Sequence, residues 1–217
     1  MTGLAEHGVS SVTTTDPDVR RGFARDASGL ELVPAVVARP TDAAEVRELL
    51  ASAARDGIPV TPAGGQSSTT GASICDTGML LSLRGLDRIL DLDVAGRVVR
   101  VEPGVPLGAL KRRLAADGLE KNTVGYAPVF DLVDWFVGSE GTLGVILAAE
   151  LTLLPLPTHV TGLAIPFTHE AAALAFVAAA RESASPAPRC LEFMDEAALA
   201  IARTAAADPT WASSAAA

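Results

Sequence analysis

One short stretch of the chain carries the strongest indication of its fold and chemistry. It is a loop rich in glycine and hydroxyl side chains that directly follows a short apolar strand, and it reads Thr61-Pro62-Ala63-Gly64-Gly65-Gln66-Ser67-Ser68-Thr69-Thr70-Gly71-Ala72-Ser73. Glycine lets a main chain approach a bound group closely, and backbone N–H groups can then point at an anion. The stretch therefore predicts a loop that binds a phosphate or pyrophosphate. The alternative is an ordinary surface loop.

Two better-known phosphate-binding loops do not fit this stretch. A P-loop requires Gly, four residues and then Gly-Lys-Ser/Thr, and neither that spacing nor the lysine is present. A Rossmann fingerprint requires Gly-x-Gly-x-x-Gly, which is absent as well. Spacing alone therefore leaves the ligand of the loop open.

The residues on either side of the loop predict alternating helices and strands. Asp16 and Pro17 favour the start of a short helix, and Asp42 with Glu45 favours the start of a longer one that Gly57 ends. The expected strands in this part of the chain are Leu32–Val37, Ile58–Pro62, Met79–Leu83, Ile89–Asp93, Arg97–Glu102 and Val145–Leu154, with a further helix at Leu107–Asp117.

A Pro155-Leu156-Pro157 linker precedes a different pattern. Beyond it the sequence predicts strand, helix, strand and helix at Leu163–Phe167, Glu170–Arg181, Cys190–Phe193 and Asp195–Ala207. This order indicates the opening of a separate α+β module.

Composition excludes several classes of protein. The 217 residues carry a net charge of −9, and no Lys/Arg run could follow a phosphate backbone, which excludes a nucleic-acid partner. The apolar run Ala171–Ala180 is too short to span a bilayer, and the polar N-terminus has no signal-peptide pattern. We expect a soluble, cytoplasmic protein.

The metal-binding and disulfide-forming residue types are few and scattered. Cys75 and Cys190 are the two cysteines, which predicts free thiols rather than a disulfide framework. The histidines are His7, His159 and His169, and no pair has metal-ligand spacing. The sequence therefore predicts no metal site.

Four further motifs turn these patterns into a family resemblance. In chain order they are Arg25-Asp26-Ala27-Ser28-Gly29, Val36-Val37-Ala38-Arg39-Pro40, Val101-Glu102-Pro103-Gly104-Val105 and Gly138-Ser139-Glu140-Gly141-Thr142-Leu143-Gly144-Val145-Ile146. With the loop at Gly65, this series resembles the PCMH-type FAD-binding flavoproteins of the vanillyl-alcohol oxidase superfamily, of the D-lactate dehydrogenase and glycolate oxidase D-subunit kind. The resemblance implies an α+β fold, with an FAD-binding domain at residues 1–157 and the beginning of a substrate-binding or cap domain at residues 158–217.

The resemblance also implies which residues bind the cofactor. They are Pro62, Ala63, Gly64, Gly65, Gln66, Ser67, Ser68, Gly71 and Ala72 in the first loop, and Glu140, Gly141, Gly144 and Ile146 in the second. For Glu140 the alternative is a carboxylate that bonds local amides, and for Ile146 it is a place in the core. Some relatives tether FAD to a histidine that follows two glycines of the first loop. Gln66 stands there in this chain, which implies noncovalent FAD.

Two departures from the family pattern limit the expected function. Gly118-Leu119-Glu120 passes directly into Lys121, where relatives have a long segment, so we expect an internal shortening near residues 119–120. The second module also ends early, and the catalytic residues of relatives have no counterpart; Lys121 and Tyr126 can titrate, but structural contacts explain them better. The resemblance implies an FAD-dependent oxidoreductase acting on a 2-hydroxy acid such as D-lactate or glycolate.

Two alternatives to an active enzyme remain from the sequence. The first is a noncatalytic or truncated flavin-binding remnant, which would associate with itself or with a completing chain because missing strands expose apolar surface. The second is an unrelated α/β binding protein, which requires the motif series to be a coincidence.

Overall fold

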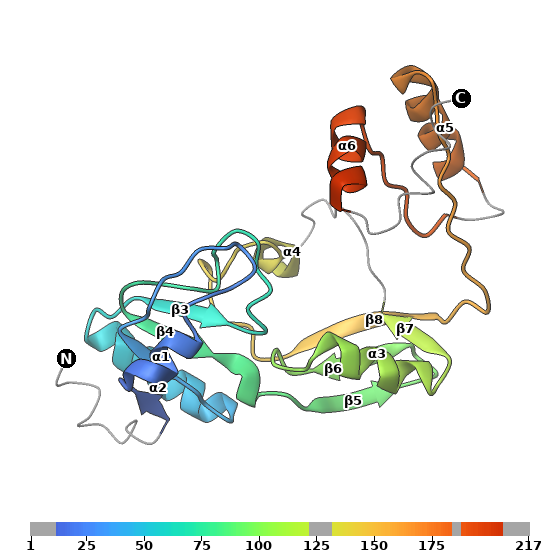
Figure 1. The fold of residues 1–217 in the computed structure, drawn as a ribbon. Helices are drawn as coiled ribbons and strands as arrows, with labels where there is room; N and C mark the ends of the chain where they lie inside the picture. Colours follow the sequence, from blue (N-terminus) through green and yellow to red (C-terminus); the bar gives the residue numbers. More distant parts are fainter. Residues whose placement is uncertain (1–11, 122–131, 184–187, 206–217) are drawn as a thin grey trace. The chain divides into compact units, whose positions relative to one another are not determined.

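The computed structural model describes residues 12–121, 132–183 and 188–205 (Figure 1). The chain forms two compact units, Met1–Leu156 and Pro157–Ala217, and the division falls inside the proline-containing linker. The first unit holds both sheets and every residue that the sequence predicts at the cofactor.

The first sheet surrounds the strand that leads into the glycine-rich loop. Its strands run in the order β1 (Thr13–Thr14), β2 (Val36–Ala38), β4 (Met79–Ser82) and β3 (Val60–Ala63). β2, β4 and β3 are parallel, whereas β1 is antiparallel to β2. The carboxyl ends of the three parallel strands therefore meet at one edge of the sheet, which is where ligands bind in sheets of this kind.

Apolar side chains cover both faces of this sheet. Val36, Met79 and Leu81 pack on one face with Val46 and Leu49 of helix α2 (Ala43–Arg55). The opposite face is formed by Val37, Leu80 and Ala63, with Phe23 and Cys75 packed against them. Alternate residues of a strand point to opposite faces, so a sheet buried on both sides needs continuous apolar strands.

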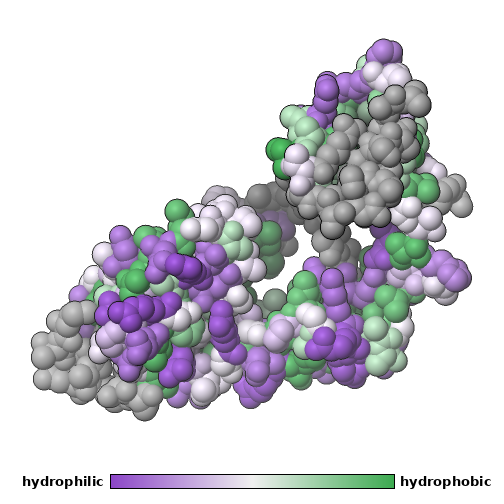
Figure 2. Space-filling model, viewed as in Figure 1, coloured by the Kyte–Doolittle hydropathy of each residue, from purple (hydrophilic) through white to green (hydrophobic). Residues whose placement is uncertain are grey.

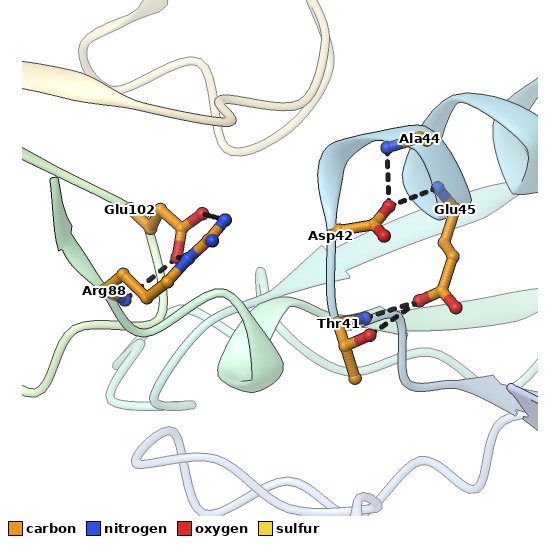
Figure 3. Close-up of polar contacts among 6 residues, drawn as sticks. All are labelled: Thr41, Asp42, Ala44, Glu45, Arg88 and Glu102. Atoms are coloured by element: carbon orange, nitrogen blue, oxygen red, sulfur yellow. Dashed lines mark hydrogen bonds and ion pairs between the residues drawn. The ribbon is translucent and has the colours of Figure 1, made fainter.

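Both predicted helix starts in this region are confirmed. The Asp42 carboxylate accepts from the N–H groups of Ala44 at 2.8 Å and Glu45 at 2.9 Å, and the Glu45 carboxylate accepts from the Thr41 N–H at 2.7 Å (Figure 3). Helix α1 (Pro17–Gly22) begins after Asp16 in the same manner. These bonds satisfy N–H groups that a helix leaves free at its first turn.

The second sheet is antiparallel and lies in the same unit. Its order is β5 (Ile89–Asp93), β6 (Val98–Val101), β8 (Ala149–Pro155) and β7 (Leu119–Lys121), and the 3-10 turn η3 (Leu83–Gly85) precedes β5. Helix α3 (Leu107–Ala115) packs Leu110 and Leu114 against Val99 and Leu153 of the sheet. The predicted hairpin is confirmed as β5 and β6.

Two details of this sheet differ from the sequence prediction. β7, at the position of the expected internal shortening, was not predicted. A three-residue strand shows no periodicity, and β7 exists only through its pairing with Leu153–Pro155 of β8. The strand expected from Val145 begins only at Ala149. Val145 and Leu147 instead pack against the core of the first sheet.

The unit Pro157–Ala217 contains two helices in its described part. Helices α5 (Glu170–Arg181) and α6 (Glu196–Ala205) agree with the predicted ones. The strands predicted at Leu163–Phe167 and Cys190–Phe193 are wrong, since no described residue pairs with either segment and a strand is stable only in a ladder. None of the described helices is long and apolar enough to cross a membrane.

Candidate functional site

Two segments that lie far apart in the sequence meet at the carboxyl end of β3. A Cβ atom on Gly141 would lie 2.5 Å from Cγ of Pro62, so the second glycine-rich turn touches the start of the first loop. The hydroxyl of Thr70 donates to the Glu140 carboxylate at 3.2 Å and joins the same two segments. The structure therefore brings together the two loops that the sequence predicts on opposite sides of a cofactor.

The first loop presents free hydrogen-bond donors. The backbone N–H groups of Gly65, Gln66, Ser67 and Ser68 donate to no described residue. A Cβ atom on Gly65 would meet no atom within 4 Å, so its surface is open. A run of free N–H groups in an open glycine-rich loop is suited to bind an anion such as a pyrophosphate, and these residues fit that group.

Other N–H groups of the loop are already used. The Ser68 hydroxyl accepts from the N–H groups of Thr70 and Ala72, each at 3.2 Å. Ser68 thus folds the second half of the loop onto itself. Ala72 lies in the loop as predicted, but its N–H is occupied by this bond.

Gln66 anchors the loop to the N-terminal segment. Its backbone is left-handed, with φ of 54°. Its side-chain Nε2 lies 2.9 Å from the Phe23 carbonyl, 3.2 Å from that of Arg25 and 3.4 Å from that of Ser73. The residue that replaces the tethering histidine of some relatives is therefore a structural donor here.

The Arg25–Gly29 motif reaches the loop through Asp26. The Asp26 carboxylate accepts from the Ser73 hydroxyl at 3.0 Å and from the Ser28 N–H at 3.0 Å. Hydrogen bonding by Ser28 is the main cause that lowers the pKa of Asp26 below its usual value; burial opposes it, and weaker hydrogen bonding by Ser73 adds to the lowering. A negative charge is thus held beside Ser73, at the end of the loop.

Arg84 is a site residue that the sequence analysis did not identify. It lies in η3, the turn that follows β4, at the edge where the loop begins, and its guanidinium donates to the carbonyl of Gly64 at 3.2 Å and to Oε1 of Gln66 at 3.1 Å. Its position just beyond the end of a parallel strand was the available signal, but no motif contains it. An open cavity of about 450 Å³ adjoins it and is also lined by Phe23, Arg39 and Ser82.

The second loop is a series of left-handed turns. Gly138, Glu140 and Gly141 all have positive φ, of 80°, 51° and 82°. Glu140 bonds the Thr70 side chain rather than a neighbouring amide. Ile146 is 47% exposed, whereas its neighbours Val145 and Leu147 pack against the core, so Ile146 is turned away from that core.

No residue in the described part of the chain is assigned as a catalytic base. Lys121 lies in β7, His169 stands at the start of α5, and Tyr126 lies outside the described residues. No group of three His, Cys, Asp or Glu side chains suited to a metal ion occurs in the described part of the chain. Cys75 and Cys190 are both free, and burial raises the pKa of the Cys75 thiol.

Comparison with known proteins shows that the chain is similar to FAD-linked oxidoreductases. Residues 34–125 match the family described as FAD binding domain. An uncharacterized FAD-linked oxidoreductase of Mycobacterium tuberculosis is 26% identical over 219 residues, which cover 77% of this chain and 48% of that protein. D-lactate dehydrogenase of Anaerostipes hadrus is 26% identical over 215 residues, which cover 75% of this chain and 45% of that protein.

A solved structure shares the fold of this chain. The structure of an alkyldihydroxyacetonephosphate synthase superposes with a TM-score of 0.58 at 16% identity, over 69% of this chain and 40% of that one. The match of residues 34–125 to an FAD binding domain confirms the resemblance to PCMH-type flavoproteins. FAD is the cofactor that this domain implies.

The aligned lengths differ between this chain and its relatives. The chain spans about half the length of the curated relatives that it matches. The alignment of 219 residues includes 77% of the 217 residues here, which is about 167, so at about 52 positions the relative has a residue and this chain has none. The alignment with D-lactate dehydrogenase, 215 residues covering 75% of the chain, has a similar excess.

Proposed function

We propose that the chain binds FAD noncovalently, with the pyrophosphate on the first loop and the second loop on the other side of the cofactor. The observation that supports this most directly is the run of N–H groups from Gly65 to Ser68 that donate to no described residue. The loop that carries them contacts the Gly138–Gly144 turn through Pro62 and Thr70. The proposed contacts are those predicted from Pro62 to Ala72 and from Glu140 to Ile146.

We further propose an oxidoreductase that acts on a 2-hydroxy acid of the D-lactate or glycolate type. The named relative that supports this substrate class is D-lactate dehydrogenase. When bound, FAD supplies the hydride acceptor, and the protein positions it and excludes water. In this chain the loop N–H groups hold the anion of the cofactor, and Gln66 and Asp26 hold the loop.

A second candidate is a flavin-binding protein without turnover. Two observations favour it. At about 52 aligned positions the relative has a residue and this chain has none, and no catalytic base is assigned among the described residues. Such a chain would bind FAD and require another chain to complete it.

One titration distinguishes these candidates. The purified chain is mixed with FAD, and flavin fluorescence and the visible spectrum are recorded before and after anaerobic addition of D-lactate or glycolate. Binding with bleaching supports the enzyme, and binding without bleaching supports the second candidate. Acid precipitation should release all flavin, because Gln66 cannot form the covalent bond. Absence of FAD binding would contradict the cofactor assignment.

A further inference from the structure

The N–H groups that face the proposed anion are held from behind by one side chain. Arg84 donates through Nε to the Gly64 carbonyl at 3.2 Å, and through Nη2 to the Gly65 carbonyl at 3.5 Å and to Oε1 of Gln66 at 3.1 Å. Its guanidinium also lies over the ring of Phe23, 5.5 Å from the ring centre. One planar group thus contacts three consecutive residues of the loop.

Gln66 completes this arrangement. Because Arg84 donates to Oε1, the amide nitrogen must face the opposite way, toward the carbonyls of Phe23, Arg25 and Ser73. A left-handed backbone is unfavourable for a residue that carries a side chain. These hydrogen bonds explain why Gln66 holds that conformation without being glycine.

The planarity of the peptide group links the two faces of the loop. The carbonyl of Gly64 and the N–H of Gly65 belong to one peptide plane and point in opposite directions, and the same holds for the carbonyl of Gly65 and the N–H of Gln66. Holding both carbonyls on Arg84 therefore fixes the direction of both N–H groups. Those N–H groups make no hydrogen bond to any residue that the structure describes.

We propose that Arg84 and Gln66 form a clamp that preorganises the N–H groups of Gly65 and Gln66 for a pyrophosphate. Arg84 is a positioning residue in this proposal, because it acts through the loop and touches the carbonyl side rather than the anion. The inference rests on the proposed FAD binding and adds the residues that determine its strength. Preorganisation raises affinity because the loop need not be ordered on binding.

A simpler role for Arg84 would be to attract the anion by its positive charge. Substitution of Arg39 provides a control for the loss of such a charge. Arg39 lines the same open cavity as Arg84, and its side chain makes no hydrogen bond or ion pair with a described residue. An Arg39→Ala variant removes the same charge from the same edge of the sheet without touching the loop.

The test measures binding of FAD and ADP, which share the pyrophosphate, to the full chain and its variants. Arg84→Ala should weaken the binding of both ligands about tenfold. Arg84→Lys keeps the positive charge but lacks the planar guanidinium, so it should not restore the affinity. Gln66→Glu should weaken both as well, since a carboxylate cannot donate to the three carbonyls. Arg39→Ala should stay within about twofold of the wild type.

Two further readouts separate positioning from a change in folding or in charge. The melting temperature of each ligand-free variant shows whether it folds, and Arg84→Lys provides the test if Arg84→Ala does not. The dependence of FAD binding on salt should have the same slope for wild type and Arg84→Ala, since the removed charge does not contact the anion.

Each contrary outcome has a defined meaning. Wild-type binding by Arg84→Ala, full rescue by Arg84→Lys, or an equal loss in Arg39→Ala would overturn the clamp while leaving FAD binding intact. Failure of the wild-type chain to bind FAD or ADP would overturn the proposed function and the clamp together.

Discussion

Single residues determine how closely the two glycine-rich loops approach each other. Gly141 combines a left-handed φ of 82° with direct contact to the Pro62 ring, and Gly138 has a similar φ of 80° but open space where a side chain would lie. Both positions favour glycine for their conformation, but only at Gly141 does the tertiary structure require the absence of a side chain.

This contrast predicts a graded effect of alanine. Gly138→Ala should lower the free energy of unfolding by about 1–2 kcal/mol, the cost of the left-handed backbone. Gly141→Ala should add a further loss of about 1–3 kcal/mol from the clash with Pro62 and should also weaken FAD binding. Urea denaturation of both variants measures the difference, and equal losses would show that the loops do not touch as described.

Sequence reasoning identified the two loops that the structure brings together, but not the contacts of every residue in them. Gln66 was recognised as the replacement for a tethering histidine, yet its three carbonyl partners come from positions up to 43 residues away. Arg84 was missed because its partners, the carbonyls of Gly64 and Gly65 and the side chain of Gln66, lie 18 to 20 residues away and form no motif with it. The cofactor assignments of the individual loop residues stay predictions.

At the scale of elements, one ion pair joins the ends of the β5–β6 hairpin. Glu102 is buried, and its carboxylate accepts from the N–H of Arg88 at 2.9 Å, from Nε at 3.1 Å and from Nη2 at 2.7 Å (Figure 3). The hydrogen bonds from Arg88 lower the pKa of Glu102 below its ordinary value, against a smaller effect of burial. The hairpin therefore depends on an ionised Glu102.

The direction of that pKa shift predicts how stability changes with pH. A carboxylate whose pKa is lower in the folded state stabilises the fold above its unfolded pKa of about 4.3, and this stabilisation is lost as pH falls through the lower, folded pKa. Glu102→Gln should therefore lower the free energy of unfolding at about pH 7. The difference between the variant and the unmodified chain should largely disappear near the folded pKa of Glu102. Urea denaturation of both proteins at a series of pH values from about 7 down to about 3, which begins well above the ordinary pKa of a carboxyl group, measures this. A difference in stability that does not change with pH would contradict the assignment.

The elements themselves were predicted where the local pattern was strong. Helices α2 and α3 and the β5–β6 hairpin have caps, periodicity or a turn within their own residues. The two strands expected after the linker failed because an apolar run alone cannot provide a partner strand. β7 was missed for the opposite reason, since only its partner β8 makes it a strand.

At the scale of the whole molecule, apolar side chains remain on the surface. Leu132, Trp135 and Val137 of helix α4 (Leu132–Phe136) and the residue after it are 80%, 63% and 75% exposed. Hydrophobic residues reach the surface on both units of the chain (Figure 2). Exposed apolar patches of this kind favour association.

We predict that the chain self-associates in a concentration-dependent manner. Light scattering during size exclusion should give masses above the 22.2 kDa of one chain, and replacing Leu132 and Trp135 by Lys should shift the population toward that mass. Arg47→Glu, on the exposed side of α2, serves as the matched control for an altered surface charge. A single 22.2 kDa species for the unmodified chain at all concentrations would contradict the prediction.

The sequence by itself determined the family, the α+β fold and the two glycine-rich segments, because glycine positions, caps and periodicity act within a few residues of each other. Only the tertiary structure decided that these segments touch at Pro62 and Gly141, and that Arg84 and Gln66 hold the first loop from behind. Such contacts join residues that are distant in the chain, so they depend on how the strands assemble at one edge of the sheet.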